Sequence, residues 1–246
     1  MKERPIIFND EMVRAILSGT KTMTRRPMKV QPESPSFGLS FIAESKRKSD
    51  EGKYFWSISD ACGLKMRSNP FPCPFGSIGD RLWVREAFSC IGNEDGHPID
   101  ADDNLCEREN AMRIYRASAI QKPNNYGLWT SPDGFDFEGG WTPSILMPRW
   151  ASRITLEITD VRVERLQDIT EGDAQAEGIS PAVELLPEYP DTYLTPRGDF
   201  ATARVAFQRL WESIYGDDSW DANPWVWVIA FKRVATGIAA GASKGE

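Results

Sequence analysis

The most informative stretch of the sequence is Gly19-Thr-Lys21-Thr-Met-Thr24-Arg25-Arg26, which lies between a predicted short helix and a predicted strand. Asn9 is a favourable N-cap for the helix, and Gly19 favours its end because glycine readily adopts the left-handed conformation found there. Apolar residues recur between them with the helical period; they are Met12, Val13, Ile16 and Leu17. The threonines after Gly19 favour extended backbone up to Pro27. We therefore expect the lysine, threonine and arginine side chains on an extended segment directly after a helix.

The remaining pattern predicts short strands, two further helices and long connecting loops. Alternating apolar and polar residues, or short apolar runs, indicate the strands; these are 6–8, 54–58, 81–86, 113–116, 153–163 and 225–231. The further helices are expected from Thr170 to about Glu177 and over 201–215. The second of these is expected to bury one broad apolar face, made of Val205, Phe207, Leu210, Trp211 and Ile214. Such a mixture predicts an α+β domain built on a small barrel.

Loop-rich segments interrupt this pattern without a break in composition that would mark two domains. We expect a single domain over residues 1–234, with insertions at about 31–78, 91–148 and 180–199, and a flexible tail at 235–246. A long insertion such as 91–148 is often functional, as a lid or a binding segment, although it is equally compatible with a passive insertion.

The net charge is −7, which argues against a protein that coats DNA or RNA through bulk positive charge. Residues 1–31 nevertheless carry seven basic side chains against three acidic ones. A local anion-attracting face is one interpretation of this asymmetry. A solvated basic surface is the alternative.

Neither a membrane-spanning segment nor a signal peptide is expected from the sequence. Its longest apolar run, 225–231, is much shorter than the roughly 20 residues that a spanning helix needs. A cytoplasmic protein is therefore expected.

Metal and cofactor sites are not predicted. Cys73, Cys90, His97 and Cys106 offer the donor types of a Cys3His zinc site, but their spacings match no compact zinc template, and we leave this possibility open. The sequence also lacks a phosphate-binding loop, a dinucleotide fingerprint and a Gly-x-Ser-x-Gly elbow. Because His97 is the only histidine, a Ser-His or Cys-His mechanism is disfavoured.

The pattern Gly19-x-Lys21-x-x-Thr24-x-Arg26 after a short helix resembles the signature of the ASCH domain, Gly-x-Lys-x-x-Glu-x-Arg, with Thr24 in the position of the glutamate. Further matches follow in the family's order; they are Gly79-Asp80 before a strand, a strand at 155–159, a helix opening at Thr170-Glu171, and a closing strand at 226–231. The resemblance implies a PUA-like small β-barrel related to RNA-associated proteins. The chain is similar to the longer, prophage-type members.

One branch of this family shares Lys-x-x-Thr and removes the acetyl group from N(4)-acetylcytidine. The resemblance implies that Lys21, Thr24 and Glu177 are the catalytic residues of a metal-independent amidohydrolase. A threonine hydroxyl needs a base to become a useful nucleophile, and a lysine with a lowered pKa can act as that base. In a straight strand Lys21 and Thr24 would point to opposite faces, roughly 10 Å apart, so the chain must bend for them to converge.

The expected substrate-binding residues are those that carry positive charge or an aromatic ring, together with the glycine of the motif; they are Gly19, Arg25, Arg26, Trp83 and Arg85. The ligand is expected to be a nucleoside or a short single-stranded RNA. Two other functions remain open. One is a non-catalytic module that binds RNA or a modified nucleotide, and the other is a prophage accessory protein whose insertions bind a protein partner.

Overall fold

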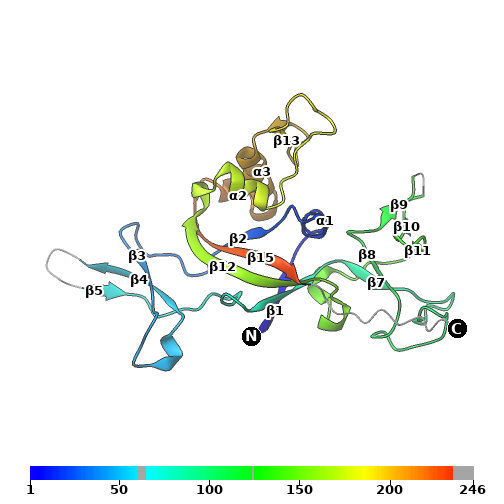
Figure 1. Ribbon diagram of the computed structural model, residues 1–246, viewed down its shortest axis with the longest axis horizontal. Coiled ribbons are helices and arrows are strands. Elements are labelled where there is room, and N and C mark those ends of the chain that lie inside the picture. Colours follow the sequence, from blue (N-terminus) through cyan, green and yellow to red (C-terminus); the bar gives the residue numbers. More distant parts are fainter. Residues whose placement is uncertain (60–64, 124, 235–246) are drawn as a thin grey trace. The chain divides into compact units, whose positions relative to one another are not determined.

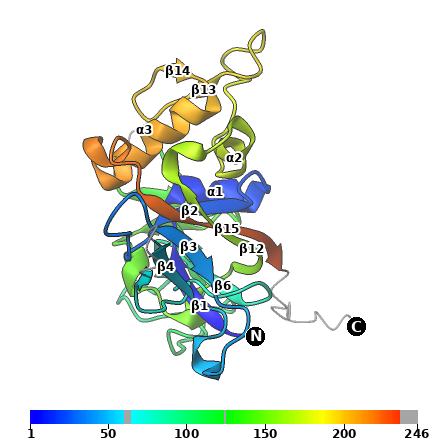
Figure 2. The same cartoon turned by 90° about the vertical axis from the view of Figure 1, so that its left-hand side faces the viewer.

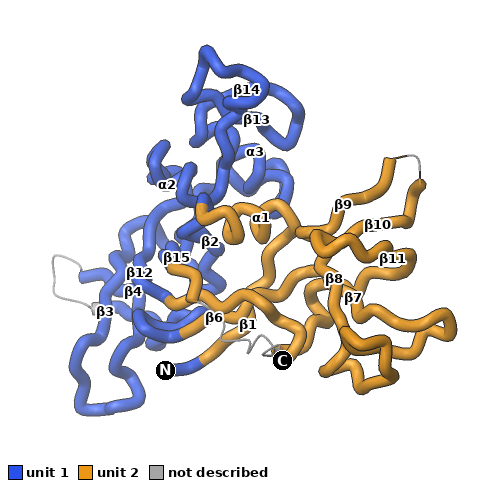
Figure 3. The backbone as a smooth tube through the Cα atoms, turned by 45° about the vertical axis from the view of Figure 1, so that its right-hand side comes forward, with its two compact units in different colours: residues 1–2, 20–80, 158–231 blue, residues 3–19, 81–157, 232–246 orange. Residues whose placement is uncertain are grey.

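The computed structural model describes residues 1–59, 65–123 and 125–234, so the predicted tail at 235–246 lies outside the described residues. The chain divides into two compact units, each built from separated segments (Figure 3). Unit 1 comprises residues 1–2, 20–80 and 158–231, and unit 2 comprises residues 3–19, 81–157 and those after 231. The prediction of one domain with insertions stays a prediction.

Unit 1 holds α2 (Glu171–Ala176) and α3 (Ala203–Tyr215), which pack against each other (Figure 1). Its largest sheet has the order β12-β15-β2, formed by β2 (Met23–Pro27) and by most of β12 (Thr155–Arg165) and β15 (Trp225–Val234). β2 and β15 run antiparallel side by side (Figure 2). Two smaller antiparallel sheets complete the unit, namely β3 (Gly38–Phe41), β4 (Tyr54–Ser59) and β5 (Lys65–Arg67), and the pair β13 (Tyr193–Leu194) and β14 (Phe200–Ala201).

Unit 2 begins with β1 (Glu3–Ile7) and α1 (Asp10–Ser18). β1 pairs in parallel with β6 (Arg81–Arg85), which pairs in turn with the first residues of β12. Short antiparallel strands fill the rest of the unit; they are β7 (Phe88–Cys90) with β8 (Arg113–Tyr115), and β9 (Ile120–Gln121), β10 (Leu128–Thr130) and β11 (Asp136–Glu138). Single 3₁₀ turns occur in both units; they are Lys48–Asp50, Ser144–Leu146, Arg149–Ala151, Leu166–Asp168 and Asp217–Ser219.

The α+β class is confirmed. In the described part of the chain the hydrogen-bonded strands form open sheets rather than a closed ring, so the small barrel stays a prediction. None of the described helices is long and apolar enough to cross a membrane.

The helix before the motif forms as predicted, because its two ends carry the expected caps. The Asn9 side chain accepts a hydrogen bond from the backbone N–H of Met12 at 2.9 Å. Gly19 adopts φ 83°, and its N–H donates to the carbonyl of Ile16. A residue with a β-carbon would be strained at this φ, which explains why glycine ends the helix.

The strands predicted at 54–58, 81–86, 113–116, 153–163 and 225–231 are also confirmed, with ends shifted by a few residues. The structure also contains short strands that the sequence pattern does not predict, and these form by pairing with neighbouring strands. In the region 31–78, β3 and β5 flank β4, and in the region 91–148 three two- or three-residue strands follow β8. Strands this short carry too little periodicity to be recognised in the sequence.

The apolar face predicted for α3 is partly wrong. Val205 and Ile214 are 37% and 45% exposed, whereas Ala203 and Ala206 are buried beside Phe207 and Trp211. The buried side follows the positions 203, 206, 207 and 211, which share one helical face, and Val205 lies away from it. This face packs in the core cluster of unit 1, which consists of Leu166, Ile169, Ala174, Tyr193, Ala203, Ala206, Phe207, Trp211, Trp220, Val226 and Val228. A smaller cluster in unit 2 contains Phe88, Met147 and Ala151.

Candidate active site around Lys21 and Glu177

The motif segment is held between β15 and the end of α2, all within unit 1. Thr24, Arg25 and Arg26 of β2 lie opposite residues 229, 228 and 227 of β15. Just before β2, the backbone N–H of Thr22 donates to the carbonyl of Ala176 at 2.9 Å, while the Thr22 carbonyl accepts from Phe231. Lys21 itself forms an isolated antiparallel bridge with Glu177. Two backbone neighbours therefore fix the segment, one on each side.

Helix α2 delivers Glu177 to this segment. The helix starts at Thr170, whose hydroxyl accepts from the N–H of Asp173 at 3.1 Å. It ends at Glu177, whose N–H donates to the carbonyl of Asp173, and Gly178 follows with φ 90°. Glu177 thus occupies the C-cap, where the chain turns away and bridges to Lys21.

Lys21 and Glu177 form a buried ion pair, although 156 residues separate them in the sequence. The Lys21 ammonium donates to Glu177 Oε2 at 2.8 Å and to the Glu177 carbonyl oxygen at 2.7 Å. The Lys21 and Glu177 side chains are 0% and 3% exposed. Direct contact between these two predicted residues is a property of the fold that no local pattern encodes.

The pKa of Lys21 lies below its ordinary value. Burial is the largest cause, because removing the ammonium group from water disfavours its charged form. The Glu177 carboxylate opposes this shift, while the charges of Arg26 and Arg25 add to it. A lysine with a lowered pKa can lose its proton closer to neutral pH, which a general base requires.

Arg25 connects Glu177 to two further carboxylates. Its guanidinium lies 2.7 Å from Asp173 Oδ2, 2.9 Å from Glu164 Oε2 and 3.6 Å from Glu177 Oε1. The Arg25 side chain is 0% exposed. Arg25 was predicted to bind substrate, but in this structure its guanidinium faces carboxylates and presents no surface to a ligand. Its guanidinium instead helps to hold the Glu177 side chain in place.

The sequence interpretation missed Asp173 and Glu164. The sequence could have indicated Asp173, because residues four apart on a helix share a face and Asp173 therefore lies beside Glu177. No local pattern could have indicated Glu164, since it comes from β12 and reaches Arg25 only through the folded sheet. Arg162 extends the network outward, with its guanidinium 2.5 Å from Glu164 Oε1 and 3.4 Å from Asp173 Oδ2.

Thr24 and Arg26 lie on the same strand as Arg25. Thr24 is 1% exposed, and Arg26 is half-buried. The strand geometry begins only at Met23, so Lys21 and Thr24 are not members of one regular strand. Both residues are buried, and the convergence of their side chains stays a prediction.

The other predicted binding residues lie in unit 2. Gly19 ends α1, where its conformation explains its presence without a ligand. Trp83 and Arg85 are neighbours on one face of β6, with the Arg85 guanidinium 5.6 Å from the Trp83 ring centre and that of Arg149 at 6.0 Å. These contacts make an arginine–tryptophan surface within unit 2.

Metal-ligand geometry is not found among the described residues, where no group of three or more His, Cys, Asp or Glu side chains gathers closely enough to hold an ion. Cys73 belongs to unit 1, whereas Cys90, His97 and Cys106 belong to unit 2.

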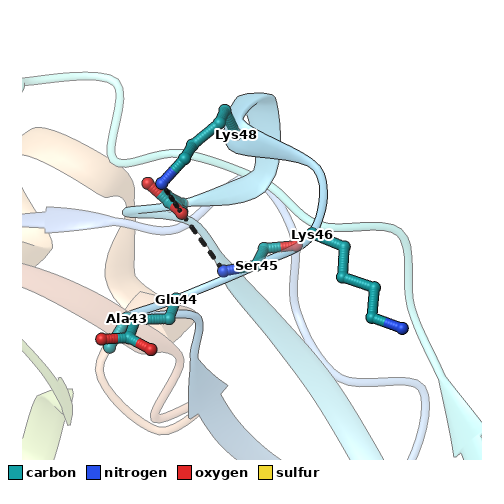
Figure 4. Close-up of a pocket in the computed structure, with 6 residues that line it drawn as sticks. Ala43, Glu44, Ser45, Lys46 and Lys48 are labelled. Carbon is teal, nitrogen blue, oxygen red and sulfur yellow. Dashed lines mark hydrogen bonds and ion pairs between the residues drawn. The ribbon is translucent and has the colours of Figure 1, made fainter.

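A surface cavity of about 520 Å³ in unit 1 contains none of the predicted site residues. It is lined by residues between Ala43 and Glu51 (Figure 4). Glu51 Oε1 accepts there from the Lys48 ammonium at 3.0 Å and from the Ser45 N–H at 3.3 Å. An exposed lysine paired with a partly exposed glutamate three residues away suits a solvated loop better than a catalytic centre.

Comparison with known proteins assigns the chain to no family, because no family model, no curated protein and no solved structure matches it.

Proposed function

We propose that this protein is an ASCH-type amidohydrolase that removes the acetyl group from N(4)-acetylcytidine or a similar acylated nucleoside. The observation that carries the proposal is the buried contact between Lys21 and Glu177, with the Lys21 pKa lowered by burial. The small barrel of the ASCH domain is part of the same proposal. Its support is the order of the motif, the capped helix before it and the long strands β12 and β15 after it.

In the proposed reaction, Thr24 Oγ1 attacks the acetyl carbonyl carbon while the neutral Lys21 amine takes the hydroxyl proton. The tetrahedral intermediate then collapses, the C–N bond breaks, and Lys21 returns the proton to the leaving N4 nitrogen. Water hydrolyses the acetyl ester on Thr24 and releases acetate. Glu177 orients the Lys21 amine through its 2.8 Å hydrogen bond, and Arg26 stabilises the oxyanion.

Burial sets a condition on this reaction. Lys21 and Thr24 are 2% and 1% exposed, so the acetyl group reaches them only when the side chains that cover them move aside. Such opening steps limit the rate of many enzymes.

The test is release of cytidine from N(4)-acetylcytidine, followed by chromatography. We expect turnover by the wild-type protein and a loss on the order of 10³-fold or more in Thr24→Val, which keeps the shape of the side chain but removes the nucleophile. Thr22→Val is the matched control, because Thr22 lies two residues away with an exposed side chain. Full activity of a folded Thr24→Val protein would exclude Thr24 as the nucleophile.

A non-catalytic RNA-binding module is the second candidate, and the arginine–tryptophan surface on β6 favours it. Arginine and tryptophan side chains packed together suit phosphate contact and base stacking. Binding of single-stranded RNA should then weaken steeply with salt, whereas hydrolysis of a neutral nucleoside should not. Salt-sensitive RNA binding without cytidine release would favour this candidate.

A further inference from the structure

A cavity of about 280 Å³ lies within unit 2, and the proposed hydrolysis does not use it. Residues 7–10 line it at the start of α1, together with Ala87, Arg116 and three residues between Trp141 and Ser144. Its volume is near the lower end of the range for small-molecule sites, about 300–1,000 Å³. The cavity therefore suits one small ring system and is too small for a peptide.

Backbone hydrogen bonds tie the walls of this cavity together. The N–H groups of Phe8, Arg116 and Thr142 donate to the carbonyls of residues 85, 87 and 88, at 3.2, 3.0 and 2.8 Å. Three segments that are distant in the sequence are thus anchored to the same short stretch, from the end of β6 to the start of β7. A cavity with fixed walls loses little entropy when a ligand enters, which favours binding.

Trp141 provides an aromatic wall. Its ring packs edge-on with Trp129, at 5.4 Å between ring centres, and at a tilt with Phe137, at 5.0 Å. Phe8, at 2% exposure, contributes a buried apolar surface to the same cavity. An aromatic ring held in this way offers a flat surface on which a second ring can stack.

Asp10 and Arg116 provide a polar edge. Arg116 Nε donates to Asp10 Oδ2 at 2.6 Å, and the Arg116 and Asp10 side chains are 41% and 22% exposed. A carboxylate acceptor beside a guanidinium donor complements a ligand edge that carries a donor next to an acceptor, as a lactam or an amidine does. Because the two charges cancel, the pair has little net preference for an anion or a cation.

We propose that this cavity is a binding site for one neutral planar heterocycle of pyrimidine-base size. The ring stacks on Trp141, and its hydrogen-bonding edge faces Asp10 and Arg116. The site is separate from the Lys21–Glu177 pair in its residues, so it does not depend on the proposed hydrolysis.

The test is calorimetric titration of the full chain with uracil and with cytosine, neither of which has an acetyl group to hydrolyse. Benzene and inorganic phosphate are the comparison probes, since they present the ring alone and the anion alone. We expect saturable binding of at least one base at one site per chain, with weaker or no binding of both comparison probes.

Two variants test the aromatic wall and the polar edge of the cavity separately. Trp141→Leu removes the stacking surface, and Arg116→Gln removes the charged donor; we expect each to weaken base binding about tenfold or more. Arg108→Gln is the matched control for an exposed arginine of unit 2, and Lys21→Met is the control for the hydrolytic site; both should bind like wild type. Thermal unfolding verifies that each variant is folded. If Arg116→Gln does not fold, Trp141→Leu serves as the test.

The proposal would be overturned by the absence of base binding by the folded wild-type protein, by binding of benzene or phosphate as strong as that of the bases, or by unchanged base binding in folded Trp141→Leu. Loss of base binding in Lys21→Met would also contradict it, by placing the ligand at the other site. Absence of acetylcytidine turnover, in contrast, bears only on the proposed function.

Discussion

Glu177→Ala is expected to lower the free energy of unfolding by about 3–5 kcal/mol, because it leaves the buried Lys21 ammonium without its carboxylate. The same change removes one of the three carboxylates around Arg25. Burying an uncompensated charge costs much more than losing an exposed ion pair. A change of this size is a large fraction of the stability of an ordinary domain, about 5–15 kcal/mol. Chemical denaturation monitored by tryptophan fluorescence measures it.

Glu188→Ala is the matched control, because Glu188 is exposed and its removal should change stability by less than about 0.5 kcal/mol. The double variant Lys21→Met with Glu177→Leu should recover part of the loss, since it replaces both buried charges with apolar groups. Equal stability of wild type and Glu177→Ala would show that the pair is not buried as described.

Lys21→Met is expected to reduce the hydrolysis of N(4)-acetylcytidine by about 10²–10⁴-fold, the usual contribution of a general base. Methionine fills a similar volume without the amine, and Glu177 keeps the Arg25 guanidinium 3.6 Å from its Oε1 atom, so the variant should fold. Lys29→Met is the control, because Lys29 is an exposed lysine just after β2. Cytidine release is measured by chromatography. Wild-type rates in the folded Lys21→Met variant would reject Lys21 as the base.

Local features of the molecule could be predicted from the sequence because local physics produces them. The Asn9 cap and the Gly19 stop mark the two ends of α1, and the alternation of Leu82 and Val84 with their neighbours correctly indicates which face of β6 is buried. The helix and strands that frame the motif follow from such patterns.

The arrangement of the candidate site could not be predicted from local sequence patterns, because the fold brings its residues together from distant segments. The family resemblance implies that Lys21 and Glu177 belong to one site. No pattern in the sequence indicates that Arg25 is buried among three carboxylates. A run of arginines in a sequence looks like an anion-binding surface, because charged side chains are usually exposed. Here Glu164 and Asp173 come from two other elements and neutralise Arg25 inside the unit.

The most direct test of the central claim is the pH dependence of N(4)-acetylcytidine hydrolysis by wild type and by Glu177→Gln. A neutral Lys21 base requires the rate to rise with pH through the lowered Lys21 pKa, at a pH below 10.5. Because the Glu177 carboxylate raises that pKa, Glu177→Gln should move the rise to lower pH, even though its rate is reduced. A rise at the same or a higher pH in Glu177→Gln, or no hydrolysis by the wild-type protein at any pH, would contradict the account.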